Sequence, residues 1–163
     1  MGTTAKRVRL VLGLLVAVGV GCGTYAVTPS APPTLPLPEG AAKICLVRRG
    51  ADGVLATYPI KDNNILVGAT VEGSCFCYFA AGGHHDLEIR TDGFDSLSLD
   101  VKAGAEYVLL QRMQSAAGKV RSQMERLDAE KGKAAMGACQ YSVLTEVPDG
   151  TYQYKLVLDE KEW

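Results

Sequence analysis

The feature that most constrains the fold of this 163-residue chain is a regular series of short β-rich runs separated by turn signals. Between residues 43 and 112 the runs alternate with turns rich in Gly, Asp and Asn. In one run Leu97, Leu99 and Val101 alternate with Ser98 and Asp100, which is typical of a half-buried strand. The series predicts an antiparallel sandwich, with strands at 43–48, 54–60, 65–69, 74–79, 85–90, 97–101 and 106–112.

Residues 113–131 follow a different pattern. Their apolar side chains recur at spacings of four and three, which predicts an inserted helix packed on the sandwich: Met113, Ala117, Val120, Met124 and Leu127. Strand signals return at 139–147, and a turn at 148–150 leads to a further predicted strand at 151–159. We therefore expect a mainly β fold of seven to nine antiparallel strands with one helix at about 113–131, forming a single domain over residues 43–159.

Four motifs in this region resemble those of a bacterial lipoprotein family of unknown function, whose domain is related to PEGA-type and other prealbumin-like sandwiches. They lie at 65–69, 75–79, 83–89 and 103–108, with Gly82 in place of the family's usual proline. The resemblance covers roughly residues 43–112, with a weaker similarity at 139–158, and the predicted helix departs from it. It implies a prealbumin-like sandwich and brings no catalytic residues.

Residues 1–21 have the organisation of a secretory signal. Lys6, Arg7 and Arg9 precede an uncharged apolar stretch at 10–21. As a helix this stretch would span about 18 Å, less than the ~30 Å of a bilayer core. The segment therefore predicts export rather than a membrane-spanning helix.

The residues around Cys22 resemble the lipobox of bacterial lipoproteins, although Gly19 stands where a branched aliphatic residue is usual. The resemblance implies cleavage before Cys22, a diacylglyceryl thioether on its sulfur and an acylated amine, which together anchor a protein stably. Two alternatives remain open: soluble secretion with cleavage after Ala26, or an uncleaved anchor extended to Val27.

Residues 22–42 are rich in proline, which fixes φ and removes a backbone donor: Pro29, Pro32, Pro33, Pro36 and Pro38. This composition predicts an extended, semi-rigid tether that holds the domain away from a membrane. Gly23 stands where many lipoproteins carry an acidic inner-membrane retention signal. We therefore expect a lipid-anchored protein of the bacterial cell envelope, in the outer membrane and facing the periplasm.

Four cysteines remain if Cys22 is lipidated. Cys75 and Cys77 share one strand face and lie too far apart along the strand to bond to each other. Disulfides are therefore expected between these two and Cys45 or Cys139, in either combination. Buried free thiols are the alternative.

Two adjacent histidines follow the Cys-x-Cys strand. Strand alternation directs His84 and His85 to opposite faces, so they cannot bind one ion together unless a bulge intervenes. A copper(I) or zinc site of Cys75, Cys77 and His85 stays an alternative. The preferred interpretation is a hairpin without a metal or other cofactor.

The remaining composition narrows the function. A formal net charge of −1 provides no basic field for nucleic acid. The chain also lacks the nucleophile, phosphate-loop and metalloprotease motifs that would indicate an enzyme. We expect an exported, membrane-anchored lipoprotein with a non-catalytic sandwich that has a structural role or binds other envelope proteins or polysaccharide. A periplasmic copper or zinc handling protein is the alternative.

Overall fold

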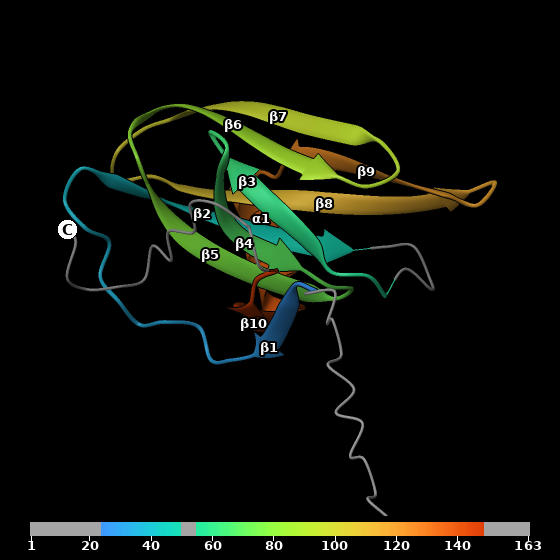
Figure 1. Ribbon diagram of the computed structural model, residues 1–163. Helices are drawn as coiled ribbons and strands as arrows, with labels where there is room; N and C mark the ends of the chain where they lie inside the picture. The colour runs from blue at the N-terminus through green and yellow to red at the C-terminus, as the bar shows by residue number, and fades with distance from the viewer. Residues whose placement is uncertain (1–23, 50–54, 149–163) are drawn as a thin grey trace, which may run out of the picture.

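The computed structural model describes residues 24–49 and 55–148, and its elements form two packed sheets with one helix (Figure 1). The six-stranded sheet has the order β1 (Ala26–Pro29), β10 (Gln140–Glu146), β5 (Ser74–Ala81), β2 (Ala41–Arg49), β8 (Glu106–Ala116), β9 (Lys119–Arg126). The four-stranded sheet has the order β4 (Ile65–Thr70), β3 (Tyr58–Asp62), β6 (Gly83–Arg90), β7 (Phe94–Val101). The predicted mainly β, sandwich-like fold with one helix is confirmed, but the described residues form ten strands rather than seven to nine, because β1 and β9 were not predicted.

Two strand pairings differ from a purely antiparallel sandwich. β2 pairs with β8 in parallel, from Lys43 opposite Glu106 to Arg49 opposite Arg112. β10 begins parallel to β5, with Tyr141 opposite Cys75. Parallel neighbours need long connections. Between β2 and β8, and again between β5 and β10, the chain crosses to the smaller sheet and returns.

The helix lies at Ala129–Gly137 (α1) rather than at 113–131. Residues 113–126 instead complete β8 and form β9, joined by a two-residue turn in which Ala117 and Gly118 have φ of 50° and 73°. Turns with positive φ at both central residues match the twist of a hairpin. The helix prediction was wrong because its apolar residues lie on two strands and the turn between them. Met113 faces inward on β8 and Met124 faces inward on β9, and together they imitate a helical spacing.

The proline-rich segment is also different from the prediction. Ala26–Pro29 forms β1, which extends the larger sheet by pairing with β10. Beyond it, the amide of Ser30 donates to the carbonyl of Tyr141 at 2.9 Å, and the amide of Ala41 donates to Pro38 at 3.1 Å. Residues 24–42 are therefore part of the folded domain and not a spacer in front of it. The predicted signal at 1–21, Cys22 and the predicted strand at 151–159 lie outside the described residues.

The space between the two sheets holds the main hydrophobic core. Its fully buried members come from both sheets, since inward residues alternate along every strand; among them are Ile44, Leu46, Ile60, Leu87 and Leu109. Phe76 of β5 packs so closely on β4 that a Cβ on Gly68 would overlap its ring. This packing fixes the inner face of the larger sheet and leaves its outer face for other contacts.

Candidate functional site

Two disulfides, which use all four described cysteines, lie on the outer face of the larger sheet. Cys45 on β2 and Cys77 on β5 lie directly opposite each other and form one disulfide, with 4.0 Å between their Cα atoms. Cys75 bonds to Cys139, which stands just before β10, at a Cα distance of 5.8 Å. Of the two combinations that the sequence left open, the structure contains this one.

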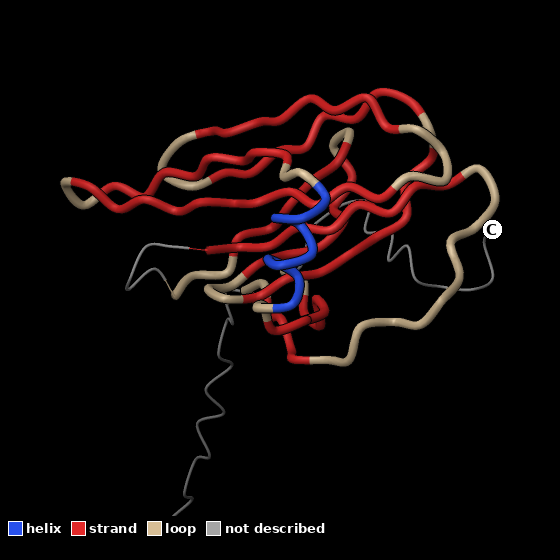
Figure 2. Tube along the Cα trace, turned by 180° about the vertical axis from the view of Figure 1, so that it is seen from behind, coloured by secondary structure: helices blue, strands red, loops and turns tan. Residues whose placement is uncertain are grey.

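Helix α1 covers part of this outer face, as the view from behind shows (Figure 2). It begins at the N-cap Asp128, whose carboxylate accepts from the amide of Lys131 at 2.8 Å. This backbone hydrogen bond lowers the pKa of Asp128. The helix packs closely because Gly132 has no side chain: a Cβ there would lie 3.0 Å from Cβ of Val108 on β8.

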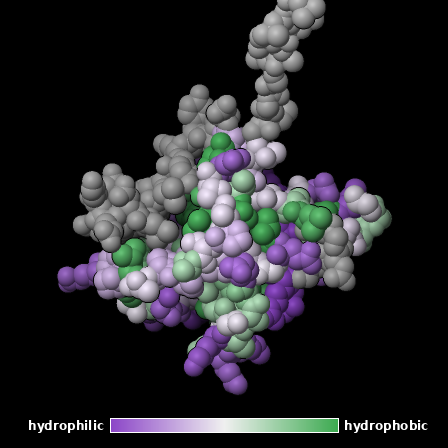
Figure 3. Space-filling model, turned by 90° about the horizontal axis from the view of Figure 1, so that it is seen from below, coloured by the Kyte–Doolittle hydropathy of each residue, from purple (hydrophilic) through white to green (hydrophobic). Residues whose placement is uncertain are grey.

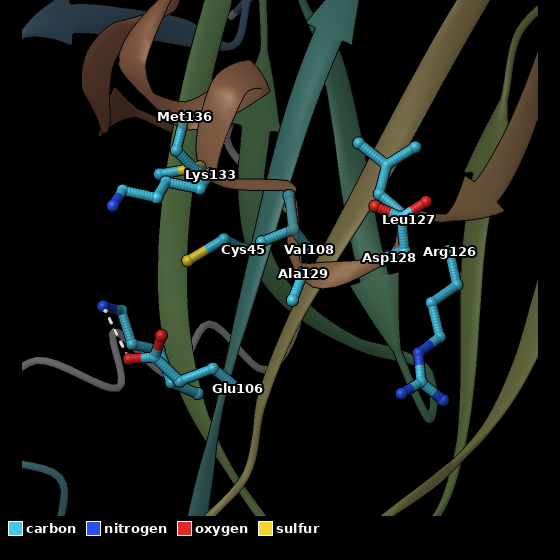
Figure 4. A pocket seen from close by; sticks show the side chains of 10 residues that line it. Cys45, Glu106, Val108, Arg126, Leu127, Asp128, Ala129, Lys133 and Met136 are labelled. Atoms are coloured by element: carbon cyan, nitrogen blue, oxygen red, sulfur yellow. Dashed lines mark hydrogen bonds and ion pairs between the residues drawn. The ribbon is translucent and has the colours of Figure 1, made fainter. Parts of the chain in front are cut away.

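A cleft of about 840 Å³ opens between α1 and the outer face of β2, β8 and β9 (Figure 4). Its apolar floor includes Val108, Leu127, Met136 and the disulfide-bonded Cys45. In Figure 4 Met136 and Lys133 extend from α1 on one side, while Cys45 and Val108 lie below them on the sheet. The cleft thus combines an apolar floor with walls from elements far apart in sequence.

Charged side chains surround this floor. Lys43 pairs with Glu106 at 3.2 Å across the parallel strands β2 and β8. Arg126 also lines the cleft at the end of β9, but its guanidinium lies 4.7 Å from the ring centre of Tyr107, a member of the inner core, and so turns away from the floor. Lys133 is exposed and, in the described part of the chain, has no carboxylate partner. An apolar centre with a charged rim is the usual composition of a protein-binding or ligand-binding surface.

A smaller hollow of about 80 Å³ adjoins the cleft. Lys43 and Met136 line both, and the second hollow is completed by Pro32, Pro33 and Leu35 of the proline-rich segment. The Cys45–Cys77 disulfide contributes one cysteine to each hollow. The proline-rich segment therefore forms a wall of the same outer surface.

The alternative metal ligands are not brought together. Cys75 and Cys77 lie on the outer face in disulfides, whereas His85 is buried on β6 of the other sheet, facing the interior. A disulfide sulfur is not the thiolate that copper(I) or zinc prefers. Among the described residues no group of three His, Cys, Asp or Glu side chains could hold a metal ion.

His85 instead belongs to a buried polar cluster that links the two sheets. Its Nδ1 lies 2.7 Å from Oδ2 of Asp62 on β3, and the hydroxyl of Tyr78 on β5 donates to the same oxygen at 2.8 Å. Its Nε2 lies 2.9 Å from the carbonyl of Ala81. Burial, and then the Asp62 carboxylate, raises the pKa of Tyr78 well above its ordinary value. The cluster positions β3, β5 and β6 and faces away from the cleft.

The second histidine is exposed, as strand alternation predicts. His84 Nδ1 lies 3.0 Å from Oδ1 of Asp100 on β7, and its Nε2 lies 3.4 Å from Asp86. The hydrogen bond to Asp100, followed by the charge of Asp86, raises the pKa of His84. The two imidazoles are thus on opposite faces of the smaller sheet.

Sequence reasoning did not identify the residues of the cleft. Lys43, Glu106, Arg126 and Lys133 are ordinary surface charges in the sequence, and only the parallel pairing of β2 with β8 brings the first two together. Arg48 was also missed; it is buried within β2 and donates to the carbonyls of Ala56 and Thr70. The sequence indicates its burial only by the position of a charged residue directly after the apolar residues 44–47.

In the part of the chain at residues 24–49 and 55–148, the structure contains no helix with the length and hydrophobicity needed to cross a membrane. Comparisons with protein-family models, curated proteins and solved structures find no match to this chain.

Proposed function

We propose that this chain is an exported lipoprotein, anchored to the bacterial cell envelope through Cys22, whose sandwich is a non-catalytic module that binds other envelope proteins or polysaccharide. The observation that carries the binding role is the cleft of about 840 Å³ beneath α1, with its apolar floor and charged rim. The outer membrane, facing the periplasm, is the proposed location.

Two observations support this assignment. The disulfides Cys45–Cys77 and Cys75–Cys139 are typical of a protein that matures in an oxidising compartment. The described lining of the cleft offers Lys, Arg, Glu and Asp side chains together with a sulfur already held in a disulfide. Such a lining is suited to holding a partner through contacts on its rim and floor rather than to attacking a substrate.

The anchor is tested by intact mass after expression of the full chain in a bacterial host. We expect the wild-type protein to start at Cys22 with the added mass of its acyl groups and to fractionate with membranes. A Cys22→Ala variant should lack the added mass and remain unprocessed. A wild-type protein that is cleaved after Ala26 and carries no lipid would contradict the proposal.

The cleft is tested by photo-crosslinking in the intact envelope. A photoreactive residue in place of Lys133 is expected to give a discrete adduct with an envelope protein, or to retain the protein on purified peptidoglycan. The matched control replaces Lys119, an exposed lysine at the start of β9 that is outside the cleft. Equal labelling from both positions, or none from Lys133, would show that the cleft is not the binding surface.

A further inference from the structure

The start of β1 lies very close in the chain to the proposed lipid-bearing residue. Ala26, the first residue of β1, is four positions after Cys22. Four extended residues reach at most about 14 Å. A free tether over residues 22–42 would instead reach roughly 65 Å in a polyproline conformation. The pairing of β1 with β10 therefore leaves only a short distance between the proposed lipid anchor and the folded domain.

The β1 strand is attached firmly enough to act as this fixed point. It pairs with β10 from Ala26 opposite Glu146 to Pro29 opposite Ser142. Val27 and Tyr25 pack against a small buried cluster of Leu66, Ala69 and Leu144. The side-chain hydroxyl of Thr145 also donates to the carbonyl of Ala26 at 3.3 Å.

From these distances we infer that the edge of the larger sheet formed by β1 and β10 rests against the lipid headgroups, with β6 and β7 directed away from the membrane. This inference rests on the proposed lipid anchor at Cys22. The six strands of the larger sheet span about 24 Å from β1 to β9 at ordinary strand spacing. The cleft, on β2, β8 and β9, then opens to the side, above the membrane surface.

The charge distribution favours the same orientation. Residues 24–38 carry no charged side chain, and β10 carries only Glu146. Figure 3, viewed from the side of β1 and β10, shows pale and green atoms mixed with purple ones on this face, with the most extended purple at its rim. An edge with a single carboxylate, Glu146, approaches an anionic membrane surface with little repulsion.

The opposite side of the molecule is acidic. Residues 83–101, which include β6 and β7, carry four outward carboxylates and one arginine: Asp86, Glu88, Asp92, Asp100 and Arg90. Asp95 also lies in this segment, but one of its carboxylate oxygens is buried. The side chain of Asp100 is 91% exposed, and that of Asp86 is 49% exposed. Anionic lipids repel such a surface, so the short connection and the charges orient the domain in the same way.

Fluorescence quenching on liposomes tests this orientation with the full, processed chain. A fluorescent amino acid replaces either Glu146, opposite Ala26 in register, or the exposed Ser96 on β7. Lipids with nitroxide headgroups act as the quencher. We expect a strong loss of emission from position 146 and none from position 96. A twenty-residue Gly/Ser insertion between Gly23 and Thr24 should abolish the loss at position 146.

The mass of the same samples separates the two proposals. Acylated, liposome-bound protein that is quenched equally at both positions, or at neither, overturns the inferred orientation and leaves the lipid anchor intact. Protein without the acyl mass overturns the proposed anchor, and the orientation with it. Quenching at position 146 that survives the Gly/Ser insertion would show that the short connection is not its cause.

Discussion

The inner face of the six-stranded sheet packs on a second sheet, whereas its outer face packs on the nine-residue helix α1 and the proline-rich segment. The inner face buries a large apolar cluster with members from both sheets. The outer cluster is smaller, with Val47, Cys75, Leu110, Ala135 and Tyr141 at its buried centre, and both disulfides lie on this side. Packing holds one face, and covalent bonds supplement weaker packing on the other.

This difference matters for the cleft, because a fully packed face leaves no room for a partner. A short helix covers too little of the sheet to fill the space beside it. The bonds of Cys45 to Cys77 and of Cys75 to Cys139 fix β2, β5 and the start of β10 without filling that space. The outer face can therefore be stable and open at the same time.

The largest expected effect comes from breaking the covalent support of the outer face. Replacing Cys75 and Cys139 together by Ala removes a crosslink between residues 64 apart. The chain-entropy model gives a loss of about 4 kcal/mol in the free energy of unfolding, measured by urea denaturation. The matched variant replaces Cys45 and Cys77 together by Ala. The disulfide that it removes closes a loop half as long, so the loss of unfolding free energy should be about 0.6 kcal/mol smaller. Unchanged midpoints in both variants would show that packing alone holds this face.

A smaller effect is expected from overfilling the inner face. In Gly68→Ala the new methyl group would overlap the ring of Phe76, which cannot move freely inside the core. We expect a loss of about 1–3 kcal/mol in the free energy of unfolding. Gly82→Ala is the control, because a Cβ there meets its nearest atom at 3.5 Å, an ordinary contact. If Gly68→Ala were as stable as the wild type, the inner face would be less tightly packed than the structure indicates.

The corresponding test of the outer face uses the two glycines of α1. Alanine at Gly137 meets no atom within 4 Å and should stabilise the helix, by up to about 1 kcal/mol. Alanine at Gly132 should lose this gain, because its Cβ would press on Val108 at 3.0–3.1 Å. In urea denaturation, Gly132→Ala should be less unfavourable in a Val108→Ala background than in the wild type, because the methyl groups that it presses on are then absent. Equal stabilisation by both alanines would mean that α1 is not held closely against β8.

The difference between buried and exposed faces also explains which strands and helices could be predicted from the sequence. Strands with an alternating pattern, such as 97–101, were found because one side of each faces the core. The helix was misplaced because two strands joined by the Ala117–Gly118 turn happen to repeat a helical spacing. The strand β1 was missed because four residues ending in proline carry too little pattern to outweigh the composition around them.

The candidate site was harder to predict than the fold for a related reason. Cysteine spacing limited the disulfides to two combinations, but only the register of β2 against β5 places Cys45 opposite Cys77. The cleft takes its lining from β2, β8, β9 and α1, and no local pattern marks residues that meet only after the sheet has formed. Cys22 and its lipid stay a prediction from the sequence.

The smallest expected effect concerns the two histidines of the smaller sheet, one on its inner face and one on its outer face. His85 is fixed inside by Asp62 and Ala81, while His84 outside depends on Asp100 and Asp86. The raised pKa of His84 means that its favourable pairing is complete below the unfolded pKa of about 6.5 and is lost as pH rises through the folded value. Asp100→Asn should therefore destabilise the protein more at about pH 5.5 than at about pH 8.5. By NMR, the titration midpoint of His84 should also fall in this variant; a midpoint unchanged from wild type would show that Asp100 does not hold the exposed imidazole.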